Sequence, residues 1–200
     1  RQKCNMTAHL LQKYLPENSL PYLQQWLGQH PIQILISRER SSKLGDYRRM
    51  PDHSHQITIN STLPPELFFF VLTHEMAHFF AFQKFGYRIR PHGREWKEEF
   101  AKMLMDSLSV YSEDLQPVIL QFSKSPKASF AASTGLVKYF HTDNGEEGYF
   151  VETLEKGTVF CYRQENYKME TKLKKNYLCT RLSTGKKYVF KPLAKVKKLS

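Results

Sequence analysis

The segment from Leu67 to Phe85 constrains the fold more than any other part of this sequence, because it is apolar on every side when read as a helix. A helix that is hydrophobic all round lies in a protein core. The residues from Thr62 to Glu66 include two prolines and a carboxylate that suit a first helical turn, and Gly86 provides a natural end. We therefore predict one long core helix that ends at about Gly86.

Three polar side chains interrupt this apolar segment: His74, Glu75 and His78. Burying an ionised carboxylate or an unpaired imidazole is costly unless something compensates for it. The two histidines lie about 40° apart around a helix, so both imidazoles project from one face and could supply two nitrogen ligands to zinc. Glu75, about 100° further round, would stand beside the metal as a general base. The alternative is a metal-free hydrogen-bond network in the core.

This spacing is the H-E-x-x-H pattern of zinc metalloproteases, which needs a third protein ligand and an open position for water. Metzincins are excluded, because Ala81 and Lys84 stand where that class has glycine and histidine. One candidate third ligand is His92, in a turn set by neighbouring proline and glycine. The other candidates are glutamates of the next helix, namely Glu95, Glu98 and Glu99.

The rest of residues 1–122 mixes helical and strand patterns. Apolar spacing predicts helices at 6–14, 20–27 and 93–110, and alternation predicts strands at 32–36, 43–49 and 55–60. Residues 123–134 are rich in Ser, Ala and Lys and are predicted to form a linker. In 135–200 the predicted strands are 136–140, 148–154, 158–162, 168–180 and 187–190. The expected fold class is α+β: a compact domain of helices and a small mixed sheet, followed by a small all-β module.

The net charge of +11 is concentrated toward the C-terminal end of the sequence. Residues 1–128 hold 16 Lys and Arg against 12 Asp and Glu, whereas residues 129–200 hold 14 against 7. Lysines and aromatic side chains interleave in the basic module, as they do on surfaces that bind nucleic acid. A solvated strand face over an aromatic core gives the same pattern. DNA is therefore a candidate partner of this module.

The three cysteines, Cys4, Cys161 and Cys179, are odd in number and far apart, which is not a disulfide framework and favours a reducing cytoplasm. No uninterrupted apolar run reaches the 18 residues expected of a membrane span. His53 and His55 form an H-x-H pair without a third partner nearby in the sequence, so a metal site there is not expected.

Four motifs, in order, resemble those of the SprT-like metalloproteases, the group that includes bacterial SprT and the eukaryotic Spartan proteases. They are Leu44–Arg48 (LGDYR), Ile57–Asn60 (ITIN), His74–His78 (HEMAH) and His92–Trp96 (HGREW). The resemblance covers about residues 1–120. It implies a compact zincin domain, His92 as the third ligand of one catalytic zinc, and substrates that are proteins bound or crosslinked to DNA.

Many SprT-like proteins continue into a zinc ribbon with two C-x-x-C pairs, and here the sequence departs from the pattern. Gln164 and Leu182 stand where Cys161 and Cys179 would need partners, so we expect a degenerate ribbon without zinc, even allowing for His141 as a ligand. The aromatic residues expected to pack the module are Tyr149, Phe150, Phe160, Tyr162, Tyr177 and Phe190.

These observations together predict a zinc metalloendopeptidase in which Glu75 activates water and the substrate lies extended along residues 43–49. Tyr87, Arg88 and Arg94 are candidates for stabilising the oxyanion. The alternative is a non-catalytic zincin-fold protein that binds DNA or a protein partner.

Overall fold

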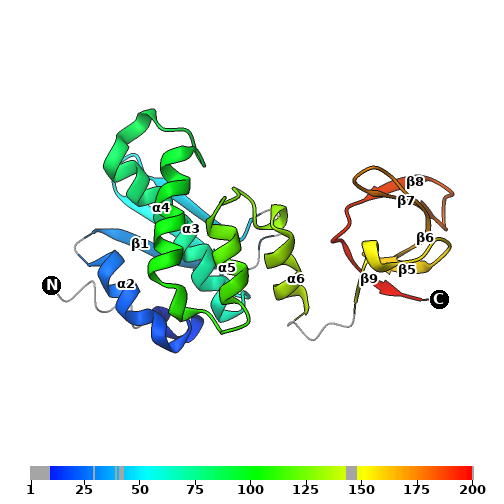
Figure 1. The fold of residues 1–200 in the computed structure, drawn as a ribbon. Coiled ribbons are helices and arrows are strands. Elements are labelled where there is room, and N and C mark those ends of the chain that lie inside the picture. Colours follow the sequence, from blue (N-terminus) through cyan, green and yellow to red (C-terminus); the bar gives the residue numbers. More distant parts are fainter. Residues whose placement is uncertain (1–9, 29, 39, 41–42, 143–147, 200) are drawn as a thin grey trace. The chain divides into compact units, whose positions relative to one another are not determined.

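The computed structural model describes residues 10–28, 30–38, 40, 43–142 and 148–199. The chain divides into two compact units, Arg1–Ser133 and Thr134–Ser200. Figure 1 shows the helices and strands that make up the chain. Each unit combines helix and sheet, which agrees with an α+β fold class.

The first unit contains a small mixed sheet. Its strands are β1 (Ile32–Ser37), β2 (Gly45–Arg49) and β3 (His55–Asn60). β3 lies in the middle and pairs in parallel with β1 and antiparallel with β2. Ile57 and Ile59 of β3 are fully buried, because alternate residues of a strand share one face. This order leaves β2 as an edge strand.

The core helix predicted from the sequence is α3 (Pro65–Phe85), which ends at Gly86 with a positive φ of 70°. It contacts β2, β3 and α4 (Arg94–Asp106), so it forms the centre of the first unit. The largest fully buried side chains around it are Phe68, Phe69, Phe79, Trp96 and Phe100.

Shorter helices complete the first unit. α2 (Leu20–Leu27) lies where the sequence predicts it, and α5 (Gln116–Ser123) packs against α4. The predicted helix at 6–14 falls largely outside the described residues, and its described end is the 3-10 turn η1 (Gln12–Tyr14). Four further 3-10 turns follow, η2 (Glu17–Ser19), η3 (Gly86–Arg88), η4 (Leu108–Val110) and η5 (Phe130–Ala132). No helix in the described ranges is long and apolar enough to cross a membrane.

The second unit begins with a helix, α6 (Thr134–Thr142), and not with the strand predicted at 136–140. That prediction is wrong because Leu136, Val137 and Phe140 follow helical spacing, and all three are buried on one face. The second unit is therefore not all-β.

Six antiparallel strands follow α6, in the order β4-β9-β5-β6-β7-β8. They are β4 (Tyr149–Phe150), β5 (Val159–Tyr162), β6 (Glu165–Lys172), β7 (Tyr177–Arg181), β8 (Lys187–Phe190) and β9 (Lys195–Lys198). The predicted strand at 168–180 is in fact parts of two strands, β6 and β7. A 3-10 turn, η6 (Val151–Thr153), follows β4.

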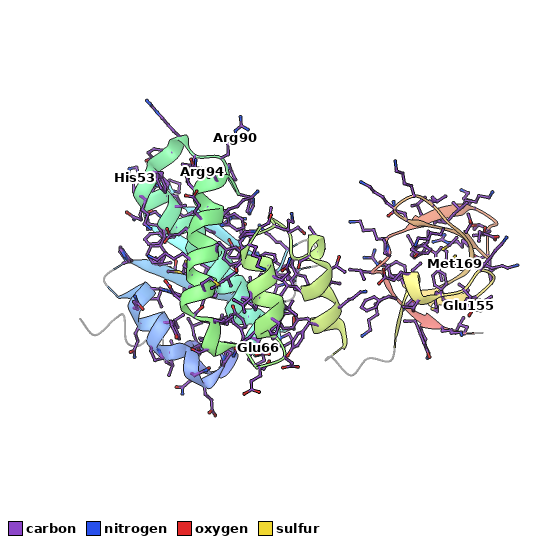
Figure 2. The ribbon with its side chains drawn as sticks, viewed as in Figure 1. His53, Glu66, Arg90, Arg94, Glu155 and Met169 are labelled. Atoms are coloured by element: carbon purple, nitrogen blue, oxygen red, sulfur yellow. The ribbon has the colours of Figure 1, made fainter. Side chains whose placement is uncertain are left out.

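The curved sheet of the second unit encloses an aromatic core. Phe160, Tyr177 and Phe190 belong to it as predicted, whereas Tyr149 is 53% exposed and does not. Met169 lies on the inner side of the sheet (Figure 2). Cys179 is buried in this core, and burial raises the pKa of its thiol to about 11. Cys161 is a free thiol on β5, separated from Cys179 by β6.

Candidate metal centre

Three histidines from two parts of the first unit meet at one point. His74 and His78 come from α3, one turn apart, and His92 comes from the turn before α4. The Nε2 atom of His92 lies 3.1 Å from Nε2 of His74 and 3.0 Å from Nε2 of His78. Within the described ranges, this is the one group of His, Cys, Asp and Glu side chains close enough to hold a metal ion together.

The three nitrogens fit a metal ion better than they fit one another. In a tetrahedral site with Zn–N bonds of about 2.05 Å, ligand nitrogens lie about 3.3 Å apart, close to the distances between these Nε2 atoms. Without a metal, Nε2 of His92 carries either one proton or one lone pair, so it can bond well to only one of its two neighbours. A dication at this point would engage all three imidazoles, which makes His74, His78 and His92 suitable zinc ligands.

Burial keeps these imidazoles neutral, as metal ligands must be. Desolvation lowers the pKa of His74 to about 3 and that of His78 to about 4, with smaller contributions from the neighbouring histidines. Burial also lowers the pKa of His92, which is more exposed. At neutral pH no proton therefore competes with a metal for the cluster.

Glu75 lies beside the cluster and is not a member of it. Its side chain is almost fully buried, and burial raises the pKa of the carboxyl to about 8, with a further increase from the charge of Asp46. The backbone N–H of Tyr47 donates a hydrogen bond to the carboxyl and acts in the opposite direction on the pKa. A buried acid whose pKa lies near neutrality can both accept and release a proton, as a general acid–base group must.

A strained turn and a buried indole hold His92 in place. His92 has a positive φ of 59°, which is uncommon outside glycine and is typical of functional sites. The turn is closed by a 2.9 Å hydrogen bond from the Gly93 N–H to the Arg90 carbonyl, and a Cβ on Gly93 would lie only 2.9 Å from that oxygen. Trp96, which is 1% exposed, packs its ring against all three imidazoles and donates from Nε1 to the His74 carbonyl at 3.3 Å.

The other candidate ligands lie elsewhere. Glu98 pairs with Arg94 at 2.6 Å, and Glu99 pairs with Lys84. His55 stacks on Tyr47 and its Nδ1 lies 2.9 Å from the Tyr47 hydroxyl, so the H-x-H pair does not form a metal site. In the second unit no described residues form such a group, and the side chain of His141 lies outside them.

The cluster lies in a cleft of about 910 Å³ that is built from Trp96 of α4 and from four further parts of the first unit. They are the β2 strand with the residues before it, the middle of α3, residues 86–92, and residues 127–131. The last part lies within residues 123–134, which the sequence predicts to be a linker. Of the three oxyanion candidates Tyr87 alone lines the cleft, whereas Arg94 is exposed at the end of the unit that also carries Arg90 and His53 (Figure 2).

The β2 strand lies along α3 with its free edge facing the cleft. A Cβ on Gly45 would touch Val71 and Glu75, the Tyr47 ring is stacked 6.2 Å from the His78 ring, and the Arg49 guanidinium lies over Phe82. The strand therefore passes both Glu75 and the histidines as it runs from Gly45 to Arg49. The Tyr47 N–H points away from β3 to Glu75, which shows that the free edge of β2 faces the acid.

The first unit combines helices and a mixed sheet with three histidines that can hold a metal ion, and Glu75 lies beside the open edge of β2. These are the parts of a metal-dependent hydrolase. The model of the SprT-like family matches residues 16–113, the part of the chain that carries all four motifs. No curated protein and no solved structure matches the chain.

Proposed function

We propose that this protein is a zinc-dependent metalloendopeptidase that cleaves peptide bonds in proteins bound or crosslinked to DNA. His74, His78 and His92 would hold one zinc ion, and Glu75 would be the general base. One observation carries the proposal: three imidazole nitrogens converge on a point while the buried carboxyl of Glu75 lies beside them without joining them.

Zinc bound at this point would supply a Lewis acid that polarises the scissile carbonyl and acidifies water. The Glu75 carboxylate would take a proton from the attacking water and pass it to the nitrogen of the leaving amine. The Tyr47 N–H orients the carboxyl by its hydrogen bond. Tyr87, which lines the cleft, is the candidate for stabilising the oxyanion.

The edge of β2 is suited to hold the substrate. It has no strand partner opposite β3 among the described residues, and it lines the cleft beside Glu75. An extended peptide can add to such an edge through backbone hydrogen bonds, which would bring its scissile bond past the cluster. Any protein segment that can be drawn out to an extended form would fit this mode of binding.

The DNA-associated substrate rests on charge and on the family resemblance. Residues 129–200 carry 14 Lys and Arg against 7 Asp and Glu, and a field of this sign attracts nucleic acid. DNA held by the second unit would raise the local concentration of proteins attached to it.

The test is cleavage of one protein, free and crosslinked to a DNA oligonucleotide, by the zinc-loaded wild type and by Glu75→Gln. The proposal requires that the variant keeps zinc and loses activity by about 100-fold or more. Equal cleavage by both proteins would overturn the role of Glu75. Faster cleavage of the crosslinked form, with an advantage that declines as salt rises, would support the substrate class.

The alternative is a non-catalytic zincin-fold protein that binds DNA or a protein partner. The missing ribbon cysteines favour it, because they show that one family metal site is dispensable in this chain. It would be supported if the wild type binds zinc and DNA but cleaves neither substrate.

A further inference from the structure

Arg49, the last residue of β2, holds its charge at a fixed place in the cleft. Its guanidinium lies 5.6 Å from the centre of the Phe82 ring and 4.9 Å from that of Tyr87. Both rings also line the cleft, and the guanidinium contacts Nδ1 of His53. These contacts limit the orientations of a side chain that would otherwise be flexible.

This cation has no carboxylate partner among the described residues. Asp46 on the same strand is occupied by Lys43 at 2.6 Å and by Arg48 at 2.5 Å. Asp52, in the turn after β2, accepts hydrogen bonds from its own turn. A half-buried guanidinium with unused N–H groups is suited to bind a carboxylate from outside the protein.

Other positive charges of the cleft would also attract a carboxylate. Arg90 and Lys127 also line it, and neither forms an ion pair with any described residue. Away from Glu75 and the neutralised Asp46, the walls of the cleft are therefore positive. Such a field favours acidic segments over basic ones before any specific contact forms.

The position of Arg49 relative to the cluster fixes which part of a substrate it would meet. Tyr47 stacks on His78, and Arg49 lies two residues further along β2, a distance of about 6.7 Å. Antiparallel pairing is the commoner arrangement of neighbouring strands. A substrate paired antiparallel with β2 would run from the Arg49 end toward the Gly45 end, so the residue near Arg49 would precede the scissile bond.

We infer that Arg49 is a specificity-determining residue, which selects substrates with an Asp or Glu two or three residues before the cleaved bond. The carboxylate would form charge-assisted hydrogen bonds with the guanidinium held over Phe82 and Tyr87. This inference rests on the proposed peptidase activity and adds a substrate preference to it.

The test begins with a proteome-derived peptide library, which is digested by the zinc-loaded protein and sequenced at the cleaved ends. Acidic residues should be enriched two or three positions before the cleaved bond. A peptide chosen from the products is then made in Glu and Gln versions at that position. Arg49→Met should lower kcat/KM for the Glu peptide by about 10- to 100-fold and leave the Gln peptide nearly unchanged.

Arg48→Met is the matched control, because it removes the same charge from the same strand but lies outside the cleft. It should keep the preference for the Glu peptide. Arg49→Lys should keep part of the preference, and Arg49→Glu should shift it toward Lys or Arg. Zinc content and thermal midpoint establish that each variant is folded.

The outcomes separate the two proposals. If the wild type cleaves no peptide in the library, the peptidase proposal fails, and the proposed preference for acidic residues fails as well. If it cleaves without acidic enrichment, or if folded Arg49→Met keeps the enrichment, the role of Arg49 is refuted while the peptidase activity stands.

Discussion

The Oε1 atom of Glu75 lies only 2.8 Å from the position that a Cβ would take on Gly45. Cγ1 of Val71 lies 2.6 Å from the same position, so no side chain fits there without a shift of α3 side chains or of β2. The glycine thus lets the edge strand approach the acid closely enough for the Tyr47 N–H to donate to it.

We predict that Gly45→Ala lowers proteolysis by about 10-fold or more while zinc binding is kept, because Glu75 or β2 must move. Adding Val71→Ala should not restore activity, since the contact with Glu75 remains. Arg48→Ala, on the same strand, is the control and should be nearly neutral. Full activity of Gly45→Ala would show that the spacing between Gly45 and Glu75 is unimportant.

His92→Ala should remove most of the zinc. The wild type should bind one zinc per chain, and the loss of one of three ligands should weaken binding by about 100-fold or more. Elemental analysis measures the stoichiometry, and zinc should raise the thermal midpoint of the wild type but not that of the variant. His53→Ala is the control. Two zinc ions per chain would point to a second site that the described residues do not contain.

Acid should destabilise the metal-free protein below about pH 6.5. The pKa of His74 is lowered to about 3 and that of His78 to about 4, so the native state keeps both neutral where the unfolded chain takes up protons. The free energy of unfolding therefore falls from about pH 6.5 toward pH 4, by at most about 1.4 kcal/mol per pH unit for each histidine. Urea unfolding measures this slope. A His74→Phe, His78→Phe variant should have a flatter profile, and an equal slope would contradict the prediction.

Glu75 contributes a pH dependence of the unfolding free energy that has the opposite sign and extends to higher pH. Its pKa is raised to about 8, so the stability that comes from a protonated carboxyl is full below about pH 4.5 and is lost as pH rises through 8. Metal-free Glu75→Gln should therefore be more stable than wild type at pH 9, and the difference should vanish near pH 4.5. Glu98→Gln, at an exposed position, should have no such trend. Equal stability of Glu75→Gln and wild type at pH 9 would show that the acid is ionised at little cost.

Asn60 should matter for both stability and activity. It is 1% exposed, and its Nδ2 donates to the carbonyls of Arg40 and Lys43, which ties the start of β2 to β3. Asn60→Ala should cost about 1–3 kcal/mol in unfolding free energy and lower proteolysis. Gln56→Ala, on the same strand as Asn60, removes only an exposed bond to Gln33 of β1 and should change stability by less than about 0.5 kcal/mol. If both variants have the same free energy of unfolding, Asn60 does not hold the start of β2 to β3.

The sequence was sufficient for α3 and for the two histidines on it. An apolar segment of that length has one stable arrangement in a core, and helical spacing alone brings His74 and His78 to one face. His92 was harder, because its approach depends on a turn with positive φ and on the packing of Trp96. The residues alone do not rank His92 above three glutamates as the third ligand. The preference for His92 rests on the family resemblance.

The strand predicted at 136–140 is wrong. Residues 136–140 form a short apolar run, which periodicity cannot assign securely to strand or helix. Residues 127–131 have the composition of a linker, yet they form a wall of the cleft. The place of residues 127–131 in the cleft depends on contacts with residues far away in the sequence, which no local pattern encodes.

Because α3 supplies both the core and the polar cluster, stability and chemistry compete for the same positions. Apolar side chains at 74, 75 and 78 would be buried without any cost of desolvation, so random substitution would tend to fill the helix with them. A lineage that no longer used the cluster would have a more stable protein within reach by a few substitutions. His74, Glu75 and His78 therefore occupy positions of α3 at which apolar side chains would make the protein more stable.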